Sequence, residues 1–158
     1  MDQTDETVEK IKTVLGEKLT EIKSPRKRRI FARVEKDSFR EALTHLISDM
    51  KITHLSTITG TDLGQEIELL YHFAHKGSIE VTIGFRIPKD NPTVRTITDL
   101  IPGAVLYERE IHEMLGVNFE GHPNLSPLIL PEEWPEGVYP LRKECKFEEL
   151  REIDSNLK

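Results

Sequence analysis

The sequence predicts an α+β fold: a two-layer domain with a mainly antiparallel sheet, followed by a long Pro-rich C-terminal tail. Three observations support this. Apolar residues recur at helical spacing on both sides of a central region. That region contains three strand-like runs at 52–59, 66–73 and 78–86, of which the second and third alternate, and five prolines are spread over 116–145. The expected order is helix, strand, helix, three-strand meander, helix. A chain of 158 residues is long enough to bury the core of one such domain.

The first expected element is an amphipathic helix over 5–19. Its apolar residues are three and four positions apart, which places them on one face. These residues are Val8, Ile11, Leu15 and Leu19. The next segment, 23–29, contains Pro25 and ends in four consecutive basic residues. We expect it to be a linker that leads into a strand at 30–34, where apolar residues alternate.

A second helix should follow this strand, with Asp37 as its N-terminal cap. Its apolar stripe runs from Phe39 to Met50 at a spacing that buries one face. Turn residues at 60–64 and 74–77 separate the three strand-like runs, so we expect antiparallel hairpins there. The centre of the chain is therefore predicted to be a meander.

The sequence from 96 to 115 returns to helical composition. The prolines that follow forbid long regular structure, yet the same segment is too apolar for a disordered tail. We therefore expect it to lie along a partner. The predicted division is an α+β domain at 1–115, an extended Pro-rich partner-binding tail at 116–145, and a polar C-terminus at 146–158 that frays or forms a short helix.

Composition excludes several classes of protein. Cys145 is the single cysteine and cannot hold an Fe–S cluster, which usually takes about four thiolates. The net charge of -6 disfavours general nucleic-acid binding. No uncharged run approaches the roughly 18 to 20 apolar residues of a membrane-spanning helix, and the acidic start lacks the form of a secretory signal, so a cytoplasmic protein is expected. The basic cluster at 26–29 contacts anionic lipid or an acidic partner, or else is a solvated strand edge.

The densest group of charged side chains lies on the expected last helix. On a helical wheel, Glu108 and Glu110 flank the apolar face, whereas Arg109, His112 and Glu113 point away from it. Two interpretations remain open. In the first, the helix is an ordinary amphipathic one with i,i+4 contacts, Arg109 with Glu113 and Glu108 with His112. In the second, the flanking carboxylates Glu108 and Glu110 are half buried and pair with the tail or with another subunit.

No catalytic, cofactor-binding or metal-binding residue is predicted. The pair His112-Glu113 begins like the helix of a zinc protease, but Gly116 stands where that motif needs a second histidine. Of the other histidines, two bracket one hairpin turn and three lie apart, so no spacing supplies a set of three ligands. The pair is His72 and His75, and the others are His45, His54 and His122. A stand-alone acid–base enzyme that uses Glu110, Glu113 and His122 is an alternative. A nucleic-acid-binding module that uses the basic cluster is the weakest, given the negative net charge.

Three short segments carry a family resemblance: 108–110 (ERE), 113–116 (EMLG) and 119–125 (FEGHPNL). They resemble the signature of the respiratory complex I 30-kDa subunit family, whose members are the C subunits of NADH dehydrogenase and similar proteins. This family includes the related subunit of membrane-bound NiFe-hydrogenase complexes. The resemblance extends more weakly over roughly 31–142, including 139–142 (YPLR).

The resemblance implies a non-catalytic accessory subunit in the peripheral arm of a membrane-bound respiratory oxidoreductase. Such a subunit is peripheral, on the cytoplasmic side of the cell membrane, in a hetero-oligomer. It docks on the hydrogenase-like large subunit, next to the Fe–S small subunit, and meets the membrane arm only indirectly. Fe–S clusters, and in hydrogenases a Ni–Fe site, belong to those partners and not to this chain. The expected subunit-interface residues are Glu108, Arg109, Glu110, Glu113, Phe119, Gly121, His122, Pro123, Leu125, Trp134, Tyr139 and Arg142.

One departure from the family pattern bears on the type of complex. Complex I members usually continue the His-Pro-Asp/Asn-Leu element with arginines, whereas this chain continues with Ser126 and Pro127. This favours a ferredoxin-linked NiFe-hydrogenase-type complex, which couples ferredoxin oxidation to proton reduction and ion pumping. The alternative is the NADH:quinone oxidoreductase itself.

Overall fold

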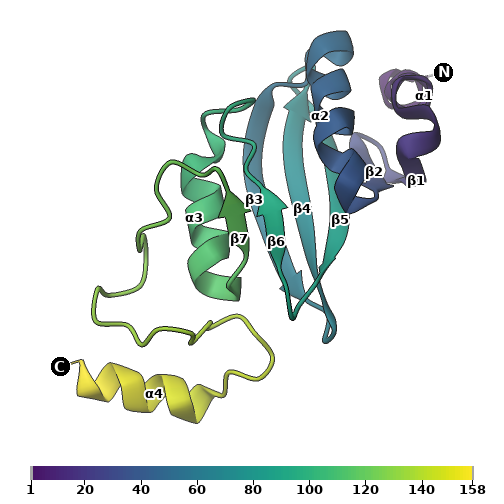
Figure 1. Cartoon of the computed structure of the whole chain (residues 1–158). Coiled ribbons are helices and arrows are strands. Elements are labelled where there is room, and N and C mark those ends of the chain that lie inside the picture. Colours follow the sequence, from purple (N-terminus) through teal and green to yellow (C-terminus); the bar gives the residue numbers. More distant parts are fainter. Residues whose placement is uncertain (1, 158) are drawn as a thin grey trace.

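The computed structural model describes residues 2–157 as a five-stranded sheet with helices packed on one face (Figure 1). Met1, the first residue of the predicted domain 1–115, and Lys158, the last residue of the predicted C-terminus 146–158, lie outside the described residues. The elements in chain order are α1 (Gln3–Leu15), the 3-10 helix η1 (Gly16–Lys18), β1 (Leu19–Arg26), β2 (Arg29–Val34), α2 (Lys36–Met50), β3 (His54–Asp62), β4 (Glu66–His75), β5 (Ile79–Pro88), β6 (Thr93–Arg95), α3 (Ala104–Leu115), β7 (Asn118–Glu120) and α4 (Phe147–Asn156).

The strand order in the sheet is β1-β2-β5-β4-β3. The predicted meander is confirmed, because β3 pairs with β4 and β4 with β5, both antiparallel. In this sheet, β2 pairs with β5 in parallel. The connection between these two strands consists of α2, β3 and β4. A separate small ladder pairs β6 with β7 in parallel. The prediction of a mainly antiparallel α+β fold is confirmed.

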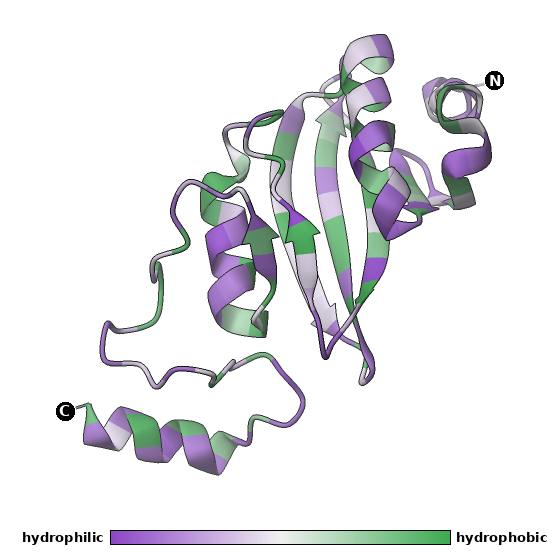
Figure 2. Ribbon diagram, viewed as in Figure 1, coloured by the Kyte–Doolittle hydropathy of each residue, from purple (hydrophilic) through white to green (hydrophobic). Residues whose placement is uncertain are grey.

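The core lies between the sheet and the helices. Alternate residues of β4 and β5 point toward α2, where the ring of Phe39 lies 4.5 Å from the rings of both Tyr71 and Phe85. Ile11 of α1 and Ile111 of α3 join the same buried cluster. Figure 2 shows apolar colour concentrated in the strands and on the inner faces of the helices. Burial of this apolar surface is the main stabilising contribution to the fold.

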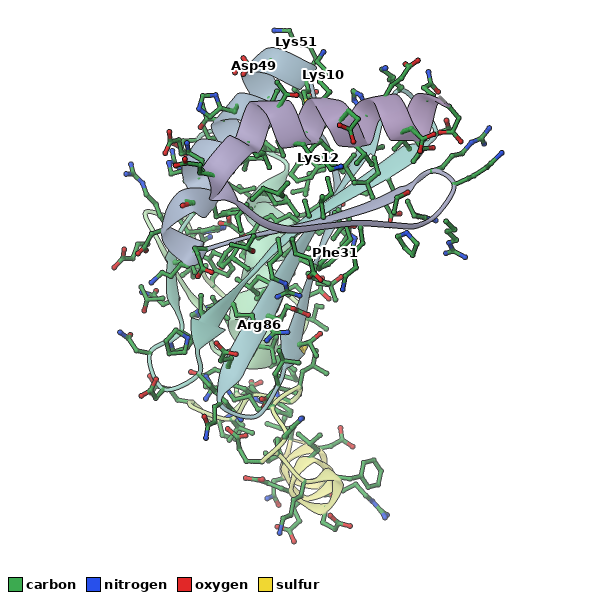
Figure 3. The ribbon with its side chains drawn as sticks, turned by 90° about the vertical axis from the view of Figure 1, so that its right-hand side faces the viewer. Lys10, Lys12, Phe31, Asp49, Lys51 and Arg86 are labelled. Carbon is green, nitrogen blue, oxygen red and sulfur yellow. The ribbon has the colours of Figure 1, made fainter. Side chains whose placement is uncertain are left out.

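The other face of the sheet carries charged side chains in cross-strand pairs. Arg33 of β2 reaches Glu68 of β4 at 2.6 Å, and Arg86 of β5 meets the same carboxylate at 3.3 Å. Arg33 also lies over the ring of Phe31 at 5.3 Å. Figure 3 shows Phe31 on the side of the β1–β2 hairpin opposite α1. The sheet is thus covered by helices on one side only, as in other two-layer folds.

The predicted linker at 23–29 is wrong, because most of it is strand β1, which pairs antiparallel with β2. As an edge strand, β1 buries none of its residues, so it lacks the alternation that marks an internal strand. An edge position also tolerates Pro25, whose nitrogen cannot donate to a neighbour. The turn that follows places Arg28 at a φ of 65°.

Two helix boundaries also differ from prediction. The first helix ends at Leu15 and not at Leu19, because Gly16 takes a positive φ of 51° and η1 redirects the chain into β1. Asp37 is not the cap of α2: the cap position is Glu35, without a side-chain bond, and Asp37 lies in the first turn. There its charge still interacts favourably with the helix dipole.

After α3 the chain returns to the core before it leaves the body. Phe119 of β7 is only 1% exposed, and Val117 is also buried. From 121 to 146 the chain forms neither helix nor strand, and α4 then stands apart with no buried residue (Figures 1 and 2). The polar C-terminus was expected to fray or to form a short helix, and it forms the short helix α4. The division into domain, tail and C-terminus stays a prediction.

Gly60 is the point of closest approach between β3 and α3, which gives a test of this packing. A Cβ at Gly60 would lie 2.4 Å from Leu115 Cδ1 and 3.1 Å from Ile111 Cδ1. We expect Gly60→Val to lower the free energy of unfolding by about 1–3 kcal/mol, because overpacking must displace α3. Urea denaturation measures the change. Gly103→Ala, with nothing within 4 Å of its Cβ, is the control; equal midpoints for the two variants would contradict this packing.

Candidate functional site

The candidate site is built on α3 and the irregular segment that follows it. Gly116 ends α3 in the left-handed region, with φ of 74°, and donates its N–H to His112 O at 2.8 Å. A Cβ on Gly116 would lie 2.6 Å from the ring of Tyr139 and 2.9 Å from Arg142 Nη2. Position 116 therefore requires glycine for two reasons: the left-handed backbone conformation and the close approach of the tail.

Glu108 lies at the inner side of α3 and is completely buried. Its carboxylate accepts hydrogen bonds from Ile97 N at 2.9 Å and from Thr96 Oγ1. Burial raises the pKa of Glu108, and these two bonds oppose the rise only in part. Burial, with the nearby charge of Glu108, also raises the pKa of Tyr71, whose buried hydroxyl has no hydrogen-bond partner among residues 2–157. Glu108 thus fixes α3 to the loop that precedes it.

His122 fastens the turn after β7 to the same helix. Its Nε2 lies 3.1 Å from Val105 O, and its Nδ1 accepts from Asn124 N at 3.0 Å. A carbonyl oxygen can only accept, so the tautomer that carries its hydrogen on Nε2 fits both bonds. The side chain is buried, with Nε2 at 3.9 Å from Glu108 Oε2. His122 therefore holds this turn in place.

Glu113 on the outer side of α3 binds the backbone of the tail. Its carboxylate accepts the N–H groups of three successive residues, Leu128 at 3.0 Å, Ile129 at 2.7 Å and Leu130 at 3.3 Å. Hydrogen bonds to an ionised group are stronger than neutral ones. The carboxylate is thereby removed from solvent, and the residue is only 9% exposed. A helix carboxylate thus pairs with the tail, but it is not one of the two for which this was predicted. Glu108 binds the loop before α3, and Glu110 is exposed.

Arg109 binds the segment just before this one. Its Nε donates to Ser126 O at 2.9 Å and its Nη2 to Pro127 O at 2.7 Å. The alternative interpretation, in which Arg109 pairs with Glu113 and Glu108 with His112, is wrong: His112 Nδ1 instead contacts Val117 O at 2.8 Å. Arg109 and Glu113 are therefore directed at backbone groups of the tail and not at each other.

The distal part of the tail is attached at the C-terminal end of α3. Arg142 Nε donates to Leu115 O at 2.7 Å, and the guanidinium group lies 4.6 Å from the ring centre of Tyr139. Next to it, Leu141 N donates to Met114 O at 3.0 Å. An arginine at the end of a helix satisfies carbonyl groups that have no partner in the helix.

A further attachment, which the sequence analysis missed, lies on the sheet. Asp62 at the end of β3 accepts from Lys143 N at 2.8 Å, Lys89 Nζ at 2.6 Å and Gly64 N at 2.8 Å. Burial would raise the pKa of Asp62, but these bonds outweigh it and lower the pKa to about 2. Lys89 also pairs with Glu144. The only sequence signal was the presence of Asp62 in a predicted turn.

Most of the predicted interface residues therefore lie along one continuous path from β7 over α3 to the tail. Glu108 and Phe119 are enclosed within the chain itself, whereas Glu110 and Pro123 are exposed. Leu125 is half buried and packs against the core. Their role as a subunit interface stays a prediction.

The three side chains of the acid–base hypothesis have different surroundings. Glu113 is engaged with the tail and His122 with Val105 and Asn124, while Glu110 is exposed. Within residues 2–157, no group of three or more His, Cys, Asp or Glu side chains is arranged to hold a metal ion. No helix within the same range is both long and apolar enough to cross a membrane.

The family model for the respiratory-chain NADH dehydrogenase 30 Kd subunit matches residues 32–150. The chain therefore belongs to this family, as the resemblance of its α3 and β7 segments indicated.

Curated relatives come from archaeal and bacterial complexes. The C subunit of the F(420)H(2) dehydrogenase of Methanosarcina mazei is 35% identical over 73% of this chain and 75% of its own length. The beta subunit of the membrane-bound hydrogenase of Pyrococcus furiosus is 32% identical over 75% of this chain and 70% of its own length. The C subunit of the NADH-quinone oxidoreductase of Roseiflexus castenholzii is 39% identical over 61% of this chain and 56% of its own length.

Two solved structures superimpose on this chain. A chain of the membrane-bound sulfane sulfur reductase, an archaeal respiratory membrane complex, superimposes with a TM-score of 0.85 at 28% identity, over 98% of this chain and 91% of its own. A trypsin-resistant fragment of Nqo5 superimposes with a TM-score of 0.63 at 21% identity, over 78% of this chain and all of its own, and shares the fold.

The low pKa of Asp62 predicts an acid-dependent loss of stability. The folded-state pKa of about 2 is below the ordinary value of 3.8, so the stabilisation is present above pH 3.8 and is lost as the pH falls through about 2. We expect Asp62→Asn to cost about 1–2 kcal/mol at neutral pH and to flatten the pH dependence between those limits. Urea unfolding at a series of pH values measures this. Asp90→Asn, an exposed neighbour, is the charge-matched control; a wild-type pH profile in Asp62→Asn would contradict the assignment.

The bonds of Glu113 predict a specific loosening of the tail. Glu113→Gln removes the charge that receives the N–H groups of residues 128–130, so their amide hydrogens should exchange about tenfold faster, equivalent to about 1.4 kcal/mol. Hydrogen exchange read by mass spectrometry on tail peptides measures the change. Glu110→Gln, on the exposed side of the same helix, should leave exchange unaltered. Equal exchange in both variants would show that Glu113 does not hold the tail.

Proposed function

We propose that this chain is a non-catalytic accessory subunit in the peripheral arm of a membrane-bound oxidoreductase complex. In this proposal it docks on the hydrogenase-like large subunit, beside the Fe–S small subunit. The Fe–S clusters, and a Ni–Fe site where there is one, belong to these partners. The observation that carries the proposal is the fixed path of the tail over α3, in a chain whose relatives are named as subunits of respiratory and hydrogenase complexes.

The tail supplies the surface suited to such docking. Between 126 and 145 it exposes apolar side chains that a free monomeric domain would usually bury. They include Leu128 at 39% exposure, Ile129 at 58% and Leu141 at 58%. The same segment is held at intervals by Glu113, Arg142 and Asp62. A pre-ordered apolar surface loses little entropy on binding, which favours stable assembly.

The type of complex is the finer part of the proposal. A ferredoxin-linked NiFe-hydrogenase-type complex is favoured by the likeness to the beta subunit of the membrane-bound hydrogenase and to the chain of the sulfane sulfur reductase. Ser126 and Pro127, where arginines are usual in complex I, fit the same choice. The alternative is the peripheral arm of an NADH:quinone oxidoreductase. In either case we place the subunit on the cytoplasmic side, away from the bilayer.

Affinity purification from gently solubilised membranes of the source organism tests this function. The tagged chain should recover a hydrogenase-like large subunit and an Fe–S small subunit, and nickel in the purified complex would distinguish the hydrogenase type from the quinone type. Recovery of the chain alone, with no large subunit, would overturn the proposal.

A truncation localises the contact. The cut should follow Leu125, because a cut after Gly116 would remove Phe119 from the core. We expect the shortened chain to keep the circular-dichroism spectrum of a folded sheet but to lose the large subunit on purification. The basic-cluster variant Lys27→Ser, altered at the far hairpin, serves as the control that should still recover it.

A further inference from the structure

A pocket of about 340 Å³ lies between the outer side of α3 and the tail. Its walls include Trp134 and Tyr139, three prolines of the tail, and the carboxylates of Glu113, Glu132 and Glu136. This volume is at the lower end of the range found for pockets that bind small ligands. It is large enough for one long side chain and too small for a folded segment.

The walls of the pocket are held in place by contacts within the chain. The indole of Trp134 donates through Nε1 to Val138 O at 2.9 Å, which closes the loop on itself. Tyr139 lies between Gly116 and the guanidinium group of Arg142, 4.6 Å from its ring centre. Proline residues at the wall further restrict the backbone. The aromatic side chains are therefore pre-positioned before any partner arrives.

The polar groups around the pocket include unused hydrogen-bond acceptors. Within residues 2–157, Glu132 and Glu136 have neither an ion pair nor a hydrogen bond, and both are exposed. His112 contacts Val117 O through Nδ1, so in the neutral ring Nε2 is an acceptor without a partner. Glu113 already receives three N–H groups of the tail. A ligand that complements these groups must bring hydrogen-bond donors and positive charge.

We propose that this pocket binds an arginine side chain of a partner protein, which deepens the proposed docking function and rests on it. A guanidinium group is planar, stacks on aromatic rings, and carries five donors for carboxylates and for the imidazole nitrogen. Lysine offers the charge but not the planar face, and an apolar side chain leaves Glu132 and Glu136 unpaired. Trp134 supplies the stacking surface, because the ring of Tyr139 is already covered by Gly116 and Arg142. Glu132 and Glu136 supply the negative charge.

Trp134 is the only tryptophan of the chain, so its fluorescence reports on the pocket directly. We expect N-acetyl-arginine amide to change this fluorescence saturably with the full chain, with a Kd of about 1–10 mM, which corresponds to about −4 to −3 kcal/mol. N-acetyl-lysine amide should bind several-fold more weakly, and N-acetyl-leucine amide should give no saturable change. An equal response to all three amides would overturn the proposal.

Substitutions distinguish binding in the pocket from attraction to the overall negative charge of the tail. The double variant Glu132→Gln, Glu136→Gln should bind the arginine amide at least about tenfold more weakly. Glu133→Gln removes the same kind of charge from a residue that does not line the pocket and should bind as the wild type does. Unchanged binding in the double variant would overturn the proposal.

Co-purification separates this inference from the proposed function. The double variant should recover less of the large subunit than Glu133→Gln does, and a higher salt concentration should narrow that difference because it screens the exposed charges. If the double variant loses arginine amide but recovers the large subunit fully, the pocket does not face that partner and this inference fails, while the docking function stands. If the wild type binds the amide but recovers no large subunit, the docking function fails.

Discussion

The tail after β7 has no helix or strand to satisfy its backbone, and the rest of the site follows from that constraint. Because prolines recur through it, its N–H and C=O groups must find partners among side chains. Glu113 takes three N–H groups, Arg109 takes two carbonyl oxygens, and Asp62 takes the N–H of Lys143. Each is a charged group bound to the backbone, which makes the hydrogen bonds strong. The tail is thereby fixed along α3 although it has no regular structure of its own.

This constraint explains why α3 carries so many charges. Glu108 points inward and binds the loop before the helix, while Arg109 and Glu113 point outward and bind the tail. Their density suggests an active site when the sequence is considered alone, but each of these groups is already used within the chain. The outer surface of the tail remains, with its exposed apolar side chains and its pocket at Trp134. This is the surface that the proposed docking would use.

Much of the fold was predictable because its main elements have clear local patterns. The apolar residues alternate in β4 and β5 and form a stripe on α2, because each of these elements buries one face. The predicted bounds of these elements differ from the observed ones by only a few residues. Strand β1 was missed because an edge strand that buries nothing has no pattern to detect. The end of α1 was misplaced because Leu19 continues the helical spacing by coincidence, while Gly16 turns the chain. The sequence predicted that α3 and its flanking segments belong to the candidate site, but it did not predict the role of Asp62.

Local patterns are enough to predict the strongly periodic elements, the family signature around α3 and the apolar character of the tail. Such patterns lie within windows of about 11–18 residues. Which group each charge binds depends on how the whole chain folds. Asp62 and Lys143 are 81 positions apart, and no local pattern links them. Arg109 and Glu113 have the spacing of an ion pair, but the tail offers backbone partners that the helix surface lacks. The choice between these contacts depends on where the chain returns in space, and that is set by the packing of the whole domain.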